Sequence, residues 1–340
     1  MFALLHGSRA ETLHLACDPS TGLRAVIAIH HARMGPALGG CRYLTYVDEE
    51  SAIEDAIQLA RNMSYKAVLA GLPLSGGKAV IMRPVHQPDR AALFEAFGRF
   101  VETLQGRYIT AVDSGTCSAD MDRVALHTRH VTSTSEEGDP SPHTALGVFA
   151  GIRATAMARL GSDNLEGLRV GIQGLGHVGY ALAGHLHAAG AELLVSDLDN
   201  RKVQRAMQAF NAHPVACETL LGTPCDILAP CGLGKVLNSA TLMQLRCAAV
   251  AGAANNPLSS LEMADQLERR GILYAPDYII NCGGLIKVAL QHRGDSAATI
   301  AAHISRIGLR LTEVYAHSQA HKRSPARIAQ ALAEHLLNVG

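Results

Sequence analysis

The sequence contains no tryptophan and few aromatic residues of any kind, and this absence removes support for several functions. Phe, Trp and Tyr together make up 4% of the 340 residues. Proteins that hold single-stranded nucleic acid stack its bases on aromatic side chains, so no such platform is expected. The formal net charge is zero, so no long-range field attracts nucleic acid or an anionic membrane. We expect neither nucleic acid nor a membrane among the partners.

Long apolar runs, paired cysteines and metal-binding motifs are missing as well. No apolar run reaches the roughly 18 residues that a bilayer span needs. The N-terminal residues lack the basic region of a signal peptide. The eight cysteines are scattered without a C-x-x-C pair, and the histidines form no H-E-x-x-H motif. The sequence therefore predicts a cytoplasmic protein with reduced thiols and no metal site.

The chain does contain enough apolar sequence for two domains. Hydrophobic residues make up 48%, and 340 residues exceed one ordinary core. The stretch 132–144, TSTSEEGDPSPHT, is rich in Ser, Thr, Pro and Gly and predicts a hinge. We expect a first domain at 1–138 and a second at 139–326. The final helix, 327–340, is a candidate to return to the first domain.

Hydrophobic periodicity predicts an α/β fold for both domains. In the first domain it predicts a β-hairpin, a helix, a strand, a second helix and a second strand at 12–31, 48–68, 76–82, 88–106 and 107–113. The second domain opens with a helix at 144–160, and alternation continues through 168–174, 177–190, 191–197, 225–230, 247–255 and 271–281. That rhythm is typical of a doubly wound parallel sheet of the Rossmann type.

A G-x-G-x-x-G motif lies between a predicted strand and a predicted helix in the second domain. Gly174 permits the tight turn, Gly176 lets the backbone approach a pyrophosphate, and Gly179 lets helix and strand pack closely. The helix N-terminus supplies N–H groups to the phosphates. Asp197 ends the next strand and is expected to bind the adenosine ribose and repel a 2′-phosphate, which favours NAD over NADP. The alternative is a glycine-rich turn without a ligand. The predicted cofactor loop is completed by Leu175, His177 and Val178.

Another glycine-rich stretch, in the first domain, contains a pair of lysines. Lys66 ends a helical pattern, and Lys78 begins a strand after Gly76 and Gly77. Burial near a second cation lowers the pKa of an ammonium group, and a lysine with a near-neutral pKa can act as a general base. Ordinary surface lysines are an equally open interpretation. Asp113 ends a strand, where α/β sites collect, but it also fits an Asx turn or a helix cap.

The ordered motifs of the whole chain resemble the amino-acid dehydrogenases of the Glu/Leu/Phe/Val family, and most closely their leucine-specific branch. The resemblance extends from about residue 10 to about residue 335 and rests on GPALGGCR, MSYKA, LSGGKAVI, YITAVDSGT, SPHTALGV, GIQGLGHVG, AGAANNPL and NCGGLIKV. It implies a homo-oligomeric, two-domain enzyme with its active site in the cleft. The implied reaction is the reversible NAD-dependent oxidative deamination of an L-amino acid to its 2-oxo acid and ammonium.

The resemblance also assigns roles to individual residues. Lys66 would pair with the substrate α-carboxylate, Lys78 would be the catalytic lysine, and Asp113 would handle protons. Residues shaping the substrate site would be Gly39 and Gly40, and those near the nicotinamide would be Thr144 and Asn255. Ala254 would also bind the cofactor. The side-chain pocket would be lined by Leu38, Met63, Ala111, Leu285 and Val288. This lining is apolar, so burying a charged substrate side chain there would be costly.

The pocket residues favour branched aliphatic substrates, led by leucine, over phenylalanine or tryptophan. Ala111 shortens the pocket, whereas Leu285 is more typical of the aromatic-specific members. One methylene group changes the binding free energy that discriminates two substrates by only about 1–3 kcal/mol, so activity on several amino acids is compatible with this preference. The chain departs from the common family pattern, without losing a catalytic group, at Ser75, Val112, Lys235, Cys282 and Lys287.

Other functions on a similar fold remain as alternatives. A non-catalytic NAD-binding regulator would not need Lys66, Lys78 and Asp113 together. A 2-hydroxy acid dehydrogenase generally uses a histidine–arginine pair, whereas here a lysine pair lies in the first domain. The reductive reaction separates this second alternative from the main hypothesis, because only an amino-acid dehydrogenase requires ammonium.

Overall fold

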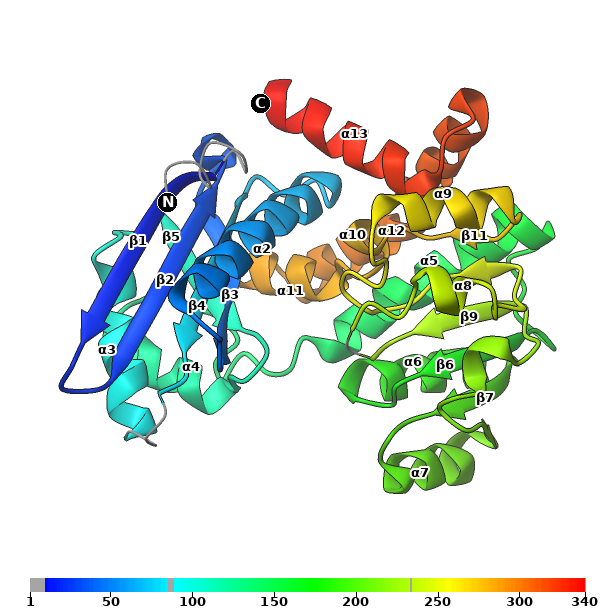
Figure 1. Cartoon of the computed structure of the whole chain (residues 1–340), viewed down its shortest axis with the longest axis horizontal. Coiled ribbons are helices and arrows are strands. Elements are labelled where there is room, and N and C mark those ends of the chain that lie inside the picture. Colours follow the sequence, from blue (N-terminus) through cyan, green and yellow to red (C-terminus); the bar gives the residue numbers. More distant parts are fainter. Residues whose placement is uncertain (1–9, 85–88, 233, 340) are drawn as a thin grey trace. The chain divides into compact units, whose positions relative to one another are not determined.

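The computed structural model describes residues 10–84, 89–232 and 234–339, which divide into two compact units (Figure 1). Unit 1 extends to Asp139 and takes in the chain again from Ala333. Unit 2 is Pro140–Leu332. The last helix, α13 (Pro325–Val339), therefore begins in unit 2 and ends in unit 1.

Unit 1 is built on a mixed sheet with the strand order β1-β2-β4-β3-β5. The strands are β1 (Ala10–Asp18), β2 (Leu23–His30), β3 (Ala37–Leu44), β4 (Ser75–Met82) and β5 (Tyr108–Val112). The helices are α2 (Glu49–Leu69), α3 (Arg90–Glu102) and α4 (Ser118–Ala125), with a short 3₁₀ turn η1 (Ala32–Met34). The predicted hairpin forms as β1 and β2, and Asp89 caps α3 by accepting the N–H groups of Ala91 and Ala92.

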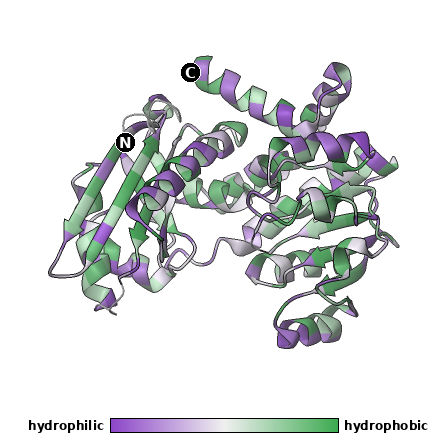
Figure 2. Ribbon diagram, in the orientation of Figure 1, coloured by the Kyte–Doolittle hydropathy of each residue, from purple (hydrophilic) through white to green (hydrophobic). Residues whose placement is uncertain are grey.

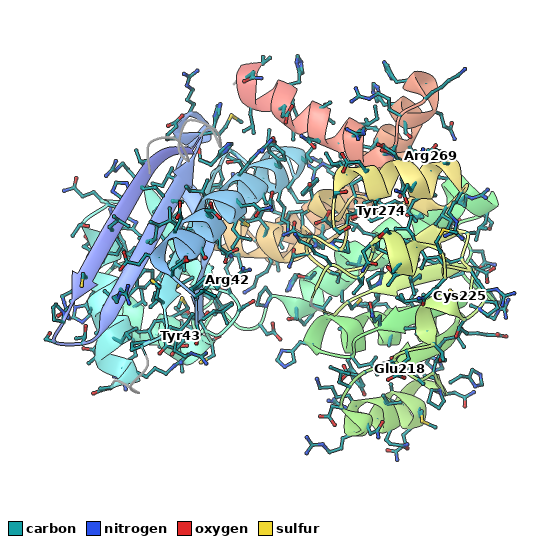
Figure 3. The ribbon with its side chains drawn as sticks, viewed as in Figure 1. Arg42, Tyr43, Glu218, Cys225, Arg269 and Tyr274 are labelled. Carbon is teal, nitrogen blue, oxygen red and sulfur yellow. The ribbon has the colours of Figure 1, made fainter. Side chains whose placement is uncertain are left out.

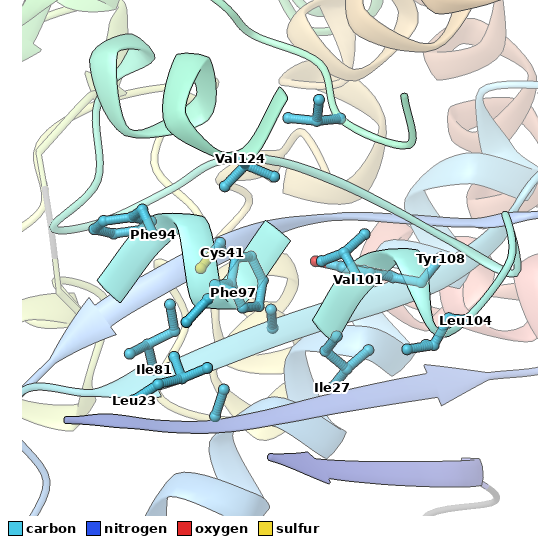
Figure 4. Close-up of a cluster of buried hydrophobic side chains, with 14 of the residues drawn as sticks. Leu23, Ile27, Cys41, Ile81, Phe94, Phe97, Val101, Leu104, Tyr108 and Val124 are labelled. Carbon is cyan, nitrogen blue, oxygen red and sulfur yellow. The ribbon is translucent and has the colours of Figure 1, made fainter. Parts of the chain in front are cut away.

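Successive side chains of each strand point to opposite sides, so the sheet has two different faces. One face carries Ile27 and Ile81 into a core with Phe94, Phe97 and Met121 of α3 and α4 (Figure 4). The opposite face meets α2, which packs on β2 and β4 through a smaller apolar cluster. Since α2 makes few contacts with β3, this face of β3 and β5 is where polar chemistry can be placed.

Unit 2 contains a parallel sheet with the order β11-β10-β9-β6-β7-β8. The strands are β6 (Arg169–Gln173), β7 (Glu192–Ser196), β8 (His213–Pro214), β9 (Ile227–Pro230), β10 (Ala249–Val250) and β11 (Leu273–Tyr274). The helices are α5 (Ser141–Leu160), α6 (His177–Ala188), α7 (Asn200–Phe210), α8 (Ser239–Leu242), α9 (Leu261–Arg269), α10 (Asp277–Ile280), α11 (Gly283–His292) and α12 (Ala297–His321), with a 3₁₀ turn η2 (Leu220–Gly222). This arrangement confirms the predicted α/β class with a Rossmann-type sheet.

The last predicted strands of unit 2 are much shorter than the sequence suggests. Within 271–281 only Leu273–Tyr274 pair with the sheet, and Asp277–Ile280 are helical. Pro276 separates them, because it has no N–H for a strand ladder but fits a helix N-terminus. Hydropathy alone does not show this break, since the segment is almost uniformly apolar. Figure 2 shows that hydrophobic residues are concentrated in the strands of both units.

Two kinds of feature are missing from the described residues. No helix in them is long and apolar enough to cross a membrane. Nor do the described ranges contain a cluster of His, Cys, Asp and Glu side chains that could hold a metal ion.

Candidate active site

Lys78 lies in β4, where hydrogen-bonded strands on either side hold its backbone. Lys78 pairs with Ala28 of β2. The Lys78 side chain points to the α2 face of the sheet, because the next residue, Ala79, points into the core on the other face. The side chain is only 6% exposed, and its Nζ lies 2.8 Å from Oδ2 of Asp113. A buried ammonium needs such a partner, so the first unit has a lysine–carboxylate pair in place of two surface charges.

Asp113 directly follows β5, and a hydroxyl group fixes the turn it belongs to. Thr116 Oγ1 accepts the Asp113 N–H at 2.8 Å and lies 3.0 Å from the Cys41 carbonyl oxygen in β3. Burial alone would raise the pKa of Asp113, but the charges of Lys78 and Arg42 outweigh it and lower the pKa to about 2. Asp113 is therefore a carboxylate at neutral pH, held on two sides by cations.

Arg42 is a site residue that our reading of the sequence did not identify. Its Nε donates to Asp113 Oδ2 at 2.9 Å, and its guanidinium also donates to both oxygens of Asp55 on α2. Tyr46 completes the group by donating its hydroxyl to Asp55 at 2.6 Å. The sequence signal that could have indicated Arg42 is its spacing from Gly40. The two residues are two apart in one strand, so their side-chain positions lie on the same face of the sheet as Lys78.

The glycines before Arg42 allow close contact between backbones. A Cβ on Gly40 would lie 2.6 Å from the Val112 oxygen and 2.7 Å from the Asp113 Cβ. A Cβ on Gly39 would lie 1.6 Å from the Gly77 oxygen in β4. Any side chain at these positions would push β3 away from its neighbours. Gly40 thus brings Asp113 toward β3, whereas Gly39 brings the Lys78 strand close.

Two of the other predicted substrate residues of unit 1 lie on the same face of the sheet. Leu38 and Ala111 are buried, and each is an even number of residues from Gly40 or Asp113 along its strand. Met63 and Lys66 lie near the C-terminal end of α2 and are partly buried. Unit 1 therefore brings Lys78 and Asp113 together beside the apolar side chains of Leu38 and Ala111 on the α2 side of its sheet.

In unit 2, the glycine motif has the local geometry expected from the sequence. Gly174 has φ +96°, which favours glycine, and a Cβ on Gly179 would lie 2.0 Å from the Gly174 oxygen. Gly176 precedes α6, and a Cβ there would meet no atom within 4 Å. The first and third glycines are required by packing, whereas the second faces open space at a helix N-terminus. That space suits the approach of an anionic ligand.

Asp197 lies at the end of β7 beside this loop. Its carboxylate accepts the N–H of Leu175 at 2.7 Å and that of Asp199 at 2.8 Å, and Lys202 Nζ is 3.8 Å away. The acidic side chain thus ties the glycine loop to the next strand. His177 and Val178 form the first turn of α6 and also belong to the loop.

The remaining predicted cofactor residues lie at two neighbouring places of unit 2. Thr144 is in the first turn of α5, and a Cβ on Gly284 would lie 2.5 Å from its Oγ1, so α11 begins against α5. Asn255 Oδ1 accepts a hydrogen bond from Asn281 Nδ2 at 3.0 Å, and the same amide donates to the Ala254 carbonyl. The pocket residues Leu285 and Val288 are both on α11.

The departures from the family pattern fall into distinct environments. Ser75 and Cys282 are buried, Val112 packs against the core of unit 1, and Lys235 is exposed. Lys287 is buried on α11, and together with burial its charge lowers the pKa of His143. A charged residue within α11 is the departure with the most direct bearing on the predicted pocket helix.

The parallel sheet and the glycine loop of unit 2 place the chain in the class of Rossmann-type dinucleotide-binding proteins. Comparison with protein families narrows this class. Residues 10–130 match the family model described as Glu/Leu/Phe/Val dehydrogenase, dimerisation domain. Residues 194–302 match the model of glutamate/leucine/phenylalanine/valine dehydrogenase. The chain belongs to the Glu/Leu/Phe/Val dehydrogenase family, as its motifs predict.

Individual relatives agree with this assignment. A leucine dehydrogenase of Bacillus subtilis is 47% identical over 291 residues, which cover 84% of this chain and 80% of that one. A valine dehydrogenase of Streptomyces virginiae is 41% identical over 343 aligned positions, covering 98% and 96%. The crystal structure of L-tryptophan dehydrogenase from Nostoc punctiforme superposes with a TM-score of 0.87 at 36% identity, covering 99% and 98%.

The relatives establish the reaction class. Leucine dehydrogenases are pyridine-nucleotide-dependent enzymes that act on CH–NH₂ donors. The predicted enzyme class, an amino-acid dehydrogenase, is confirmed.

Proposed function

We propose that this enzyme catalyses the reversible, NAD-dependent oxidative deamination of a branched-chain L-amino acid, with leucine preferred, to its 2-oxo acid and ammonium. The observation that carries the proposal is the buried Lys78–Asp113 pair, 2.8 Å apart. It lies on the sheet face that also holds Leu38 and Ala111. An acid–base pair beside an apolar wall suits the chemistry of an apolar amino acid.

The residues of unit 2 fit a dinucleotide. The open space at Gly176 would take the pyrophosphate, with the N–H groups of the first turn of α6 as donors. Asp197 would accept the ribose hydroxyls and repel a 2′-phosphate, which supports NAD. Thr144 and Asn255 would lie near the nicotinamide. NAD, when bound, supplies the acceptor for the hydride that leaves the substrate Cα.

The residues of unit 1 would perform the proton transfers. Lys66 would hold the substrate carboxylate, so that the Cα and its amine lie beside Lys78 and Asp113. Asp113, a carboxylate at neutral pH, would take a proton from the substrate ammonium and free its lone pair. Lys78, in its neutral form, would take a proton from the water that attacks the iminium carbon and then, as an ammonium, stabilise the charge that develops on the oxygen. Asp113 would return a proton to the departing amine.

Leucine is proposed over aromatic substrates because of the wall that unit 1 provides. Ala111 is 6% exposed and ends in a methyl group beside Asp113, which limits the depth available to a side chain. The valine- and leucine-acting relatives favour the same choice. The tryptophan-acting relative supports the alternative, phenylalanine or tryptophan, and Leu285 is the residue that favours it.

The test is a screen of the twenty amino acids with NAD, following NADH formation by purified enzyme. We expect kcat/KM for leucine, isoleucine and valine to exceed that for phenylalanine and tryptophan by roughly tenfold or more. A highest value for an aromatic amino acid would move the enzyme to the alternative substrate class. No NADH from any amino acid would contradict the proposed reaction.

We also propose that the enzyme is a cytoplasmic homo-oligomer. β1 is an edge strand of the unit 1 sheet, and this region matches a model described as a dimerisation domain. An exposed strand edge is a ready site for pairing between subunits. Light scattering coupled to gel filtration should give a mass of at least two chains, and a monomer at micromolar concentration would contradict the assembly.

The cysteines of the described residues are free thiols, which supports the proposed cytoplasmic location, because the cytoplasm is a reducing compartment.

A further inference from the structure

The guanidinium of Arg42 bridges the candidate proton-transfer residue and a second carboxylate. Its Nε donates to Asp113 Oδ2 at 2.9 Å, and its Nη1 donates to Asp55 Oδ2 at the same distance. Arg42 is labelled in Figure 3, on the strands of unit 1. Tyr46 donates to Asp55 at 2.6 Å, so the second carboxylate is itself held in place. Through its two hydrogen bonds, Arg42 of β3 connects Asp55 of α2 with Asp113 at the end of β5.

Both cations approach the same oxygen of Asp113. Lys78 Nζ and Arg42 Nε lie 2.8 Å and 2.9 Å from Oδ2. Among the described residues, no side chain donates a hydrogen bond to the other oxygen, Oδ1. A carboxylate with one oxygen held from two directions cannot rotate freely, so the position of Oδ1 is fixed as well.

We propose that Arg42 is the positioning residue of Asp113: with Lys78 it holds Oδ2, and so presents Oδ1 as the oxygen that exchanges the proton with the substrate amine. This inference rests on the proposed function. Arg42 acts through Asp113 and touches neither the substrate nor the reacting atoms.

The bridge is more than an ordinary surface ion pair. The side chains of Arg42 and Asp55 are 21% and 27% exposed, so both charges are largely removed from water. Such burial costs free energy that a simple connection between sheet and helix does not require. Arg24 and Glu49 already connect the same sheet to α2 at the surface, where their side chains are 48% and 74% exposed.

Electrostatics around Asp113 support the positioning role. The charged groups facing it are Lys78 from β4 and Arg42 from β3, with Asp55 of α2 behind Arg42. The Cys41 thiol and the Tyr108 phenol lie in the core on the other face of the sheet and interact with Asp113 electrostatically through it. Burial favours the protonated acid, and the two cations oppose it. Without Arg42 only Lys78 opposes burial, so the pKa of Asp113 must rise.

The experiment compares R42Q with R24Q, which removes the surface arginine link between sheet and α2. In R42Q we expect kcat to fall roughly 10–100-fold, because a misplaced proton acceptor costs rate rather than binding. KM for the amino acid should change much less, and the acidic limb of the kcat/KM profile should move to higher pH. R24Q should keep the wild-type values. R42K should recover part of kcat, since one ammonium cannot bridge both carboxylates.

A readout independent of turnover separates this inference from the proposed function. In ¹³C-NMR titration, the Asp113 carboxyl of R42Q should titrate at higher pH than that of wild type. If wild type lacks amino-acid activity but this shift occurs, the proposed reaction fails and the effect of Arg42 on Asp113 stands. If R42Q melts at a lower temperature yet keeps the wild-type kcat, pH profile and Asp113 titration, Arg42 is a structural link and the inference is overturned.

A second variant covers the case in which R42Q does not fold. Asp55→Asn leaves the arginine in place but weakens its anchor on α2. Its kcat should fall severalfold, with KM nearly unchanged, because the guanidinium can then turn away from Asp113. Wild-type kcat together with a wild-type acidic limb in Asp55→Asn would contradict the inference.

Discussion

Lys78 and Asp113 are in contact, Nζ to Oδ2, although β3 lies between their strands in the sheet. The contact is possible because Gly40, in the intervening strand, has no side chain to separate them: its Cβ would overlap Asp113. The two groups of the proposed proton-transfer chemistry are therefore assembled by unit 1 alone.

Asp113 should contribute to stability in a pH-dependent way. Its pKa is lowered from 3.8 to about 2 in the folded protein, so its contribution is complete above the unfolded value and disappears as pH falls through the folded value. Wild type should be more stable than Asp113→Asn by about 2 kcal/mol near neutral pH. The difference in the free energy of unfolding should shrink between about pH 4 and 2, as measured by urea titrations. A constant difference across that window would show that the charge of Asp113 is not what stabilises the fold.

Gly176 and Gly179 should respond differently to alanine. In Gly179→Ala the new Cβ would lie 2.0 Å from the Gly174 oxygen, so unit 2 should be destabilised by roughly 1–3 kcal/mol. In Gly176→Ala the Cβ meets nothing within 4 Å, so the melting temperature should stay near wild type while KM for NAD rises. Calorimetry measures the stability of both variants, and initial rates at varied NAD concentration measure KM. Equal loss of stability in both variants would contradict the assignment of Gly176 to the ligand.

Asp197 should determine the choice of cofactor. Asp197→Ala should raise KM for NAD and increase the ratio of kcat/KM for NADP to that for NAD, because repulsion of a 2′-phosphate is lost. Asp199→Ala is the matched control, since Asp199 caps α7 and pairs with Arg201 but is not bonded to the glycine loop. It should leave the ratio unchanged. If the cofactor ratio is the same in Asp197→Ala as in wild type, Asp197 does not recognise the ribose.

Ala111 should limit the length of the substrate side chain. Ala111→Val adds two methyl groups to a position that is 6% exposed, on the face of β5 that also holds Asp113. We expect kcat/KM to fall more for leucine than for valine, by a factor on the order of 10, because the longer side chain reaches further into the pocket. Steady-state rates with both amino acids measure this. An equal fall for the two would place Ala111 outside the side-chain pocket.

Much of the fold could be predicted because strong local signals agreed with the tertiary structure. The hairpin and the strand–glycine–helix unit around Gly174 depend on neighbouring residues, so sequence reasoning finds them. The break at Pro276 was missed because the segment is apolar on both sides, and apolar runs do not distinguish a buried strand from a buried helix.

The candidate site was predictable where motifs carry chemistry and not where distant residues meet. Lys78 and Asp113 stand beside glycines or at a strand end, and the structure pairs them. The sequence did not indicate that Arg42 belongs to the site, because most arginines are exposed and an arginine alone gives no sign of burial. Its role depends on Asp55, which lies in a helix that contains other acidic residues and gives no local sign of its partner. Only the folded sheet places these side chains together.

Leucine-dependent NADH formation by Lys78→Ala, measured together with NADH binding by fluorescence, is the most direct test of the proposed deamination chemistry. We expect kcat to fall roughly 10³-fold or more, because both activation of water and charge stabilisation are lost. NADH affinity and the folded circular-dichroism spectrum should remain near wild type. A variant that binds NADH and turns over leucine at close to the wild-type rate would show that Lys78 is not the catalytic lysine.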